Sequence, residues 1–156
     1  MNQHKIPKPK AYLDTSVISA LFDDRNPERK SLTEHFFQTM GFYEIYLSEI
    51  TVLEINRTQD IELLNKMKSV ILDLMVISLP DDTEWLVSEY MSYSIVPENY
   101  QEDAYHIAIA VLSGMDYLLS WNFKHIVRRK AKDIIRMVNS MYNLKQIEIM
   151  TPAELL

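Results

Sequence analysis

Cysteine is absent from this chain of 156 residues, and glycine occurs only twice. The lack of cysteine excludes a disulfide-stabilised scaffold and thiolate metal sites, and it suits the reducing environment of the cytoplasm. With so few glycines the chain lacks the dinucleotide-binding fingerprint and the phosphate-binding P-loop, which removes the main support for nucleotide-cofactor oxidoreductases and P-loop NTPases. No apolar run approaches the roughly 18 residues of a membrane span. We therefore expect a cytoplasmic protein with no membrane segment.

Positive charge is also scarce, with 16 Lys and Arg against 22 Asp and Glu and a formal net charge of −6. This balance disfavours a protein that coats DNA or RNA by bulk electrostatics, but it permits an enzyme whose acidic pocket binds divalent cations. The polar N-terminus lacks the apolar core of a signal peptide. We expect residues 1–9 to form a flexible tail and residues 10–156 to form a single domain with a sizeable core.

Short apolar strands alternate with helices along the chain. Hydrophobic patterning predicts strands at 10–13, 43–47, 75–79, 117–120 and 146–150. Helical spacing and capping residues predict helices at 17–22, 27–40, 49–56, 59–74, 83–93, 100–113 and 125–141, with a terminal helical turn from 151. This alternation predicts an α/β fold, a three-layer α/β/α sandwich around a central, mostly parallel sheet.

The stretch from 12 to 17 is predicted to be a buried strand that ends on a carboxylate, Asp14, and leads directly into a helix. In an open parallel sheet the carboxyl ends of the strands face the crevice where ligands bind. Asp14 could instead serve only as a helix cap, but Thr15 and Ser16 are equally good caps and would leave its carboxylate free. If Asp14 is catalytic, other elements should bring further acids to the same edge.

Glu54 and Asp103 are the acids best placed to join this carboxylate. Glu54 lies among apolar neighbours on its helix, so we favour it over Glu44 and Glu49, for which exposure or a helix-dipole role suffices. Asp103 lies in the first turn of an Ala- and Ile-rich helix, on the face expected to point inward. One turn later comes His106, which we interpret as a hydrogen-bonded residue of the helix core rather than a ligand.

Three carboxylates at one sheet edge repel one another unless cations fill the site or their pKa values rise. Carboxylate oxygens suit Mg²⁺ or Mn²⁺ rather than zinc or copper. Such ions can deprotonate a water molecule and hold a phosphodiester for in-line attack. The residues by themselves thus indicate a metal-dependent nuclease.

Four motifs occur in order along the chain: LDTSV at 13–17, SEITVLEI at 48–55, EDAYHIAIA at 102–110 and DYLLSWNFKH at 116–125. In order and spacing they resemble the PIN domain, and most closely its VapC-like branch, many of whose members are toxins of toxin–antitoxin pairs. The resemblance covers essentially the whole chain. It implies a Mg²⁺- or Mn²⁺-dependent endoribonuclease that cleaves RNA, often as a homodimer, and for a toxin it implies an antitoxin partner that blocks the active site.

The resemblance also assigns site residues. The catalytic, metal-binding acids of the family correspond to Asp14, Glu54 and Asp103. The fourth position is usually an Asp but is Asn122 here, whose carbonyl oxygen can bind a metal without adding charge. A second metal would therefore be held more weakly.

A basic cluster follows this asparagine and is the best candidate for phosphate contacts in a negatively charged chain, although a solvated helix face would look the same. Two hydroxyl residues beside Asp14 are placed to orient an attacking water. The predicted substrate-binding residues are therefore Thr15, Ser16, Lys124, His125 and Arg128.

Two other functions stay open. The missing fourth acid and the net negative charge would also suit a catalytically weakened PIN-like module that binds RNA or a protein. A phosphatase-like hydrolase with Asp14 as nucleophile is the other alternative, but the chain lacks the second Asp two residues further on that would act as its acid–base partner.

Overall fold

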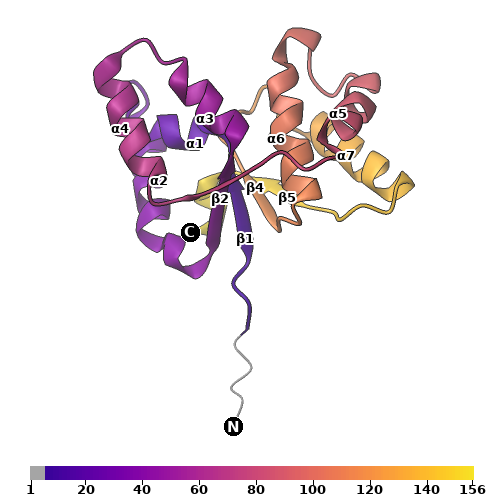
Figure 1. Ribbon diagram of the computed structural model, residues 1–156. Helices are drawn as coiled ribbons and strands as arrows, with labels where there is room; N and C mark the ends of the chain where they lie inside the picture. Colours follow the sequence, from indigo (N-terminus) through magenta and orange to yellow (C-terminus); the bar gives the residue numbers. More distant parts are fainter. Residues whose placement is uncertain (1–5) are drawn as a thin grey trace.

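The computed structural model describes residues 6–156 and contains a five-stranded sheet between two groups of helices (Figure 1). The strands are β1 (Lys10–Leu13), β2 (Glu44–Ser48), β3 (Met75–Ile77), β4 (Tyr117–Leu119) and β5 (Glu148–Met150). They lie in the order β3-β2-β1-β4-β5, and every pair of neighbours is parallel. The predicted α/β/α sandwich with a parallel sheet is confirmed. Of the predicted tail, residues 1–5 lie outside the described residues.

Two groups of helices cover the two faces of the sheet (Figure 1). One group contains α1 (Thr15–Ala20), α2 (Pro27–Thr39) and α4 (Ile61–Ile71), and the other contains α5 (Thr83–Ser92), α6 (Gln101–Leu112) and α7 (Arg129–Met141). Helix α3 (Glu49–Asn56) contacts α1 and α4 of the first group and α6 of the second. Short 3-10 helices span Met40–Phe42, Glu98–Tyr100 and Pro152–Leu155. No helix in the described part of the chain is both long and apolar enough to cross a bilayer.

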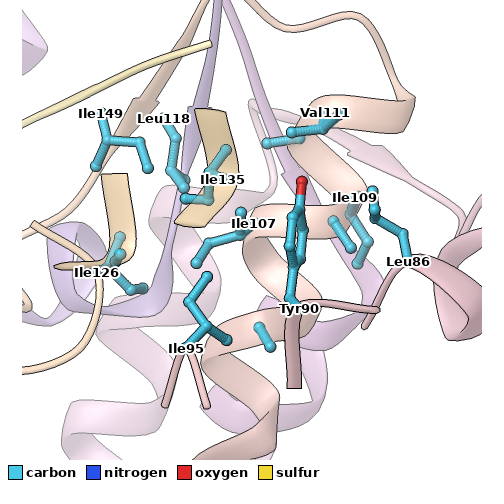
Figure 2. Close-up of a cluster of buried hydrophobic side chains, with 14 of the residues drawn as sticks. Leu86, Tyr90, Ile95, Ile107, Ile109, Val111, Leu118, Ile126, Ile135 and Ile149 are labelled. Carbon is cyan, nitrogen blue, oxygen red and sulfur yellow. The ribbon is translucent and has the colours of Figure 1, made fainter. Parts of the chain in front are cut away.

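The adjacent strands β1 and β4 are largely buried on both faces, so the sheet divides the hydrophobic core in two, whereas the edge strand β3 is mostly exposed. Because side chains alternate along a strand, Tyr12 belongs to the cluster on the side of α5, α6 and α7. Leu118 and Ile149 of the same cluster are labelled in Figure 2. Ala11 and Leu13 pack on the opposite side with α1, α2 and α4. This two-sided burial is typical of a parallel sheet and fixes β1 rigidly. The residue that follows β1 therefore has a well-defined position.

The predicted helix over 125–141 is wrong at its start, because α7 begins only at Arg129. The preceding residues form a turn held by Asn122. Its side-chain oxygen accepts a hydrogen bond from the His125 amide at 3.0 Å, and its backbone oxygen accepts from the Ile126 and Val127 amides at 3.1 and 2.8 Å. An asparagine that bonds its own backbone in this way competes with the helix. The other predicted elements are present, with ends shifted by a few residues.

Candidate active site

Asp14 lies at the carboxyl end of β1, where the chain order of the sheet reverses between β1 and β4. It precedes α1 but makes no capping hydrogen bond with its side chain. Its carboxylate instead accepts hydrogen bonds from the hydroxyls of Ser16 and Ser120, each at 2.5 Å. The side chain is therefore oriented by two neutral donors rather than left free.

Asp14 is only 3% exposed. Burial raises its pKa, and the nearby charge of Glu54 acts in the same direction. The charge of His106 and the two serine hydroxyls lower the pKa, but they do not outweigh burial. A cation bound beside such a buried acid would stabilise its ionised form and lower its pKa.

Asp103 lies in the first turn of α6, and the turn after β4 folds back onto it. Its Oδ2 accepts a hydrogen bond from His125 Nδ1 at 2.8 Å and another from Asn122 Nδ2 at 3.3 Å. Burial raises the pKa of Asp103, opposed by the bond from His125 and the charge of His106, while Glu54 adds to the increase. The structure thus brings Asp103, Asn122 and His125 together, as expected for neighbours in one site.

Glu54 projects from α3 toward α6, where it accepts a hydrogen bond from His106 Nε2. His106 is 1% exposed, and burial would lower its pKa. The neighbouring Tyr12, Glu54 and Asp14 raise its pKa instead, well above the ordinary value. The imidazole is thus hydrogen-bonded to one of the three acids and lies within electrostatic range of the other two. The alternative candidate Glu44 is at the opposite end of β2.

Two pockets open beside these acids. One, of about 390 Å³, is lined by Glu54 and Asp103 together with Arg57 and the 98–102 segment. The other, of about 690 Å³, is lined by the basic residues Lys124, His125, Arg128 and Lys130. Glu98 lines both pockets, and the hydrogen-bonded pair of Asp103 and His125 contributes one residue to each. An acidic pocket thus adjoins a basic one.

The predicted substrate-binding residues do not all share this surface. Lys124, His125 and Arg128 face the basic pocket, although Arg128 also donates a hydrogen bond to the Ile95 carbonyl at 2.7 Å. The Ser16 hydroxyl is engaged with Asp14 and accepts the Trp121 amide at 2.8 Å. The Thr15 hydroxyl is buried without a hydrogen-bond partner among the described residues.

The donor atoms fit a hard divalent cation in kind, since they are carboxylate and amide oxygens. Glu54 Oε2 and Asp103 Oδ1 make no hydrogen bond to the described residues, which leaves each free to bind a metal. In position, no three His, Asp or Glu side chains of residues 6–156 form a ready metal cluster. In this structure Glu54 bonds His106 through one carboxylate oxygen, and Asp103 bonds His125 through one of its own. The residues Asp14, Glu54, Asp103 and Asn122 are the ones that would hold Mg²⁺ or Mn²⁺.

Ser120 and Tyr12 were not anticipated from the sequence. Ser120 reads as the last residue of a buried strand, and Tyr12 as an ordinary aromatic strand residue. His106 offered a usable signal, because a polar side chain within an otherwise apolar, buried helix must find hydrogen-bond partners. Its partners come from β1 and α3, however, and the local sequence around His106 does not predict which residues they are.

No protein-family model and no curated protein matches the sequence. Solved structures do share its fold. One is VapC20 of Mycobacterium tuberculosis, described as a sarcin–ricin loop cleaving toxin. It superposes with a TM-score of 0.57 at 14% identity, covering 74% of this chain and 92% of VapC20.

Two toxin–antitoxin complexes are also similar. A chain of VapBC2 from Rickettsia felis, bound to a DNA fragment from its promoter, gives a TM-score of 0.59 at 11% identity, covering 89% of this chain and 96% of the other. A chain of DNA-bound VapBC from Salmonella typhimurium gives a TM-score of 0.59 at 16% identity, and the match covers 92% of this chain and 98% of the other. At these identities the likeness is one of fold. The chain therefore has the PIN-like fold of VapC proteins, as the sequence motifs predicted.

Proposed function

We propose that this chain is a metal-dependent endoribonuclease of the VapC type, which hydrolyses phosphodiester bonds in RNA. The observation that supports this most directly is the convergence of three acids from distant segments. Glu54 and Asp103 line one pocket, and Glu54 bonds the buried His106. Asp14 directly follows Leu13, the residue after Tyr12, whose hydroxyl bonds the other nitrogen of the same imidazole. Asp14 itself lies at the reversal point of the parallel sheet, where such folds bind ligands.

A bound Mg²⁺ or Mn²⁺ would activate a water molecule and offset the negative charge of the phosphate. Asp14, Glu54 and Asp103 would hold the ion through their carboxylates, with Asn122 contributing its amide oxygen. Ser16 and Ser120 keep the Asp14 carboxylate in one orientation, so that it needs no reorganisation to bind.

The basic pocket gives the RNA strand a path beside the acids. Lys124, Arg128 and Lys130 are placed to contact phosphates in this pocket, and His125 connects it to Asp103. These groups supply positive charge locally in a protein whose net charge is −6. That arrangement favours binding at one groove over coating the whole surface.

A protein partner follows from the same proposal. Two of the structures with this fold are VapBC complexes, so we propose that an antitoxin-like protein covers the site. A homodimer remains the expectation drawn from the sequence resemblance.

The decisive experiment is cleavage of a mixed-sequence RNA with Mg²⁺, Mn²⁺ or EDTA, comparing wild type with Asp14→Asn. Wild type should cleave only with metal, and Asp14→Asn should lose at least about 100-fold, since metal stabilisation of such a reaction amounts to several kcal/mol. Asp73→Asn, at an exposed turn after α4, is the matched control and should cleave normally. Equal cleavage by wild type and Asp14→Asn would contradict the proposal.

One observation favours a second function. Asn122 replaces the fourth acid, and its amide oxygen already accepts the His125 amide. A catalytically weakened PIN-like module that binds RNA or a protein would show this feature. Folded protein that binds RNA but gives no turnover with excess Mn²⁺ under single-turnover conditions would select this alternative.

A further inference from the structure

Four polar side chains from four different elements form one continuous hydrogen-bonded chain that ends at Glu54. Ser48 Oγ, at the end of β2, is 2.7 Å from the Tyr12 hydroxyl on β1. The Tyr12 hydroxyl is 2.6 Å from His106 Nδ1 on α6. His106 Nε2 then donates to Glu54 Oε1 on α3. The chain thus links the sheet to a side chain of the candidate metal site.

The direction of the last bond does not depend on the charge of the imidazole. An ionised carboxylate only accepts hydrogen bonds, so the proton on His106 Nε2 points to Glu54 in either state. With a neutral ring, the hydroxyls of Ser48 and Tyr12 donate toward Nδ1, and the Ile50 amide satisfies Ser48 at 3.2 Å. With a charged ring, the Tyr12 hydroxyl turns round and donates to Ser48. The imidazole is held in place in both cases.

Burial makes this arrangement costly unless every member is satisfied. Tyr12 and Ser48 are fully buried and His106 nearly so, between the carboxyl edge of the sheet and α6. A phenylalanine at position 12 would fill the same core volume without needing a partner. Glu54, by contrast, is 23% exposed in its side chain, and among the described residues His106 is its hydrogen-bond partner. Without that partner, no hydrogen bond from the described residues would hold its flexible side chain in one orientation.

We propose that His106 is a positioning residue, which holds the Glu54 carboxylate over the carboxyl edge of the sheet while Tyr12 and Ser48 fix the imidazole. The consequence for metal binding rests on the proposed function, because it requires Glu54 to be a ligand. The position of Glu54 itself is a separate matter that can be tested in metal-free protein. Groups that orient metal ligands in this way typically change metal affinity when removed.

Two substitutions at the same position separate positioning from packing. His106→Leu keeps an apolar side chain of similar size but removes the N–H donor, and His106→Gln keeps a neutral donor of similar reach. We expect the Mn²⁺ dissociation constant, measured by electron paramagnetic resonance, to rise about 10- to 100-fold for His106→Leu. His106→Gln should recover most of that loss. A merely structural role would make the two variants equal, and equal Mn²⁺ affinities would overturn the inference.

A second pair of variants controls for the loss of a buried hydroxyl. Tyr12→Phe removes the group that fixes the imidazole, and it should weaken Mn²⁺ binding to a lesser degree than His106→Leu. Tyr90→Phe removes a comparably buried hydroxyl, which donates to Asn139 at 2.6 Å in the core between α5 and α7. Tyr90→Phe should leave Mn²⁺ affinity unchanged. An equal loss in both variants would show that general destabilisation is the cause and would overturn the inference.

A metal-free readout distinguishes this inference from the proposed function. In a crystal structure of His106→Leu without metal, the Glu54 carboxylate should leave its place beside α6, and in His106→Gln it should stay. An unmoved Glu54 in His106→Leu would overturn the positioning role, whatever the protein does to RNA. If wild type neither binds Mn²⁺ nor cleaves RNA, the proposed function fails, and the position of Glu54 still decides the inference.

Discussion

The hydroxyl of Ser120 donates a 2.5 Å hydrogen bond to Asp14 Oδ2, although the two residues are 106 positions apart in the chain. Ser120 Oγ also accepts the Asn122 amide at 2.9 Å. One hydroxyl at the end of β4 therefore orients the first acid and anchors the turn that carries the fourth site position. This hydroxyl therefore links the carboxyl ends of the neighbouring strands β1 and β4 beside the candidate site.

Ser120→Ala should destabilise the protein by about 1–3 kcal/mol, because it leaves one oxygen of the buried Asp14 carboxylate, Oδ2, and the Asn122 amide without a partner. Urea unfolding measures this free energy directly. Ser140→Ala is the matched control: its hydroxyl bonds a carbonyl of its own exposed helix turn, and its effect should stay within about 0.5 kcal/mol. Similar values for the two variants would mean that Ser120 has no special role.

The metal-free protein should lose stability as pH rises above the ordinary Asp value of 3.8, because burial raises the pKa of Asp14 and of Asp103. In that range the unfolded chain has released protons that the native state still binds, so the free energy of unfolding falls until the native pKa is passed. Asp14→Asn removes one of these groups and should show a shallower decline. Urea unfolding with EDTA between pH 4 and 7 is the measurement. Parallel curves for the two proteins would contradict it.

Asn122→Asp should destabilise the protein without metal and strengthen its stabilisation by metal. In EDTA, a carboxylate would replace the amide that donates to Asp103, and the repulsion should cost about 1–2 kcal/mol. Adding Mn²⁺ should raise the melting temperature more in this variant than in wild type, because a fourth charge binds the ion more tightly. Asn122→Ala is the control, which should be destabilised both with and without metal. A Mn²⁺ effect no larger than in wild type would argue against Asn122 as a ligand position.

RNA binding should depend on the basic pocket. For single strands, each phosphate contact contributes about 0.7 to the slope of log affinity against log salt, so Lys124→Ala and Lys130→Ala should each lower the slope by about that amount. Fluorescence anisotropy in EDTA, which prevents metal-dependent cleavage, gives the affinities. Lys68→Ala, exposed on α4, should leave the slope unchanged. Unaltered binding by the Lys124 and Lys130 double variant would place the RNA elsewhere.

Most of the fold was predictable, because each element carries its own periodicity and capping residues. Helix α2 is an example: it starts at Pro27, as predicted, and the side chain of Asn26 before it accepts a hydrogen bond from the Arg29 amide. The start of α7 was not predictable in this way. There the side chain of Asn122 accepts a hydrogen bond from the backbone amide three residues on, which favours a turn over a helix. The helical spacing of the charged residues does not reveal this preference.

The site was predictable in part for a similar reason. Asp14 and Asp103 lie at element ends, and the rule that parallel strands present their carboxyl ends to one crevice brings such residues together. Tyr12 and Ser120 act through partners 94 and 106 residues away. Contacts at that separation are set by the strand order, which the sequence of one chain does not reveal.

The central position of β1 also bears on when the site can form. β1 is the first strand of the chain, yet one of its two neighbours is β4, which is fourth in sequence. Until β4 has been synthesised, β2 is the only one of these two neighbours that β1 can pair with, Asp14 lacks Ser120 and Asp103 lacks His125. A nascent chain or a truncated product that stops before β4 therefore lacks the groups that orient two of the three acids. The proposed nuclease activity is thus tied to completion of synthesis, so a protein of this kind would be inactive toward RNA during most of its own translation.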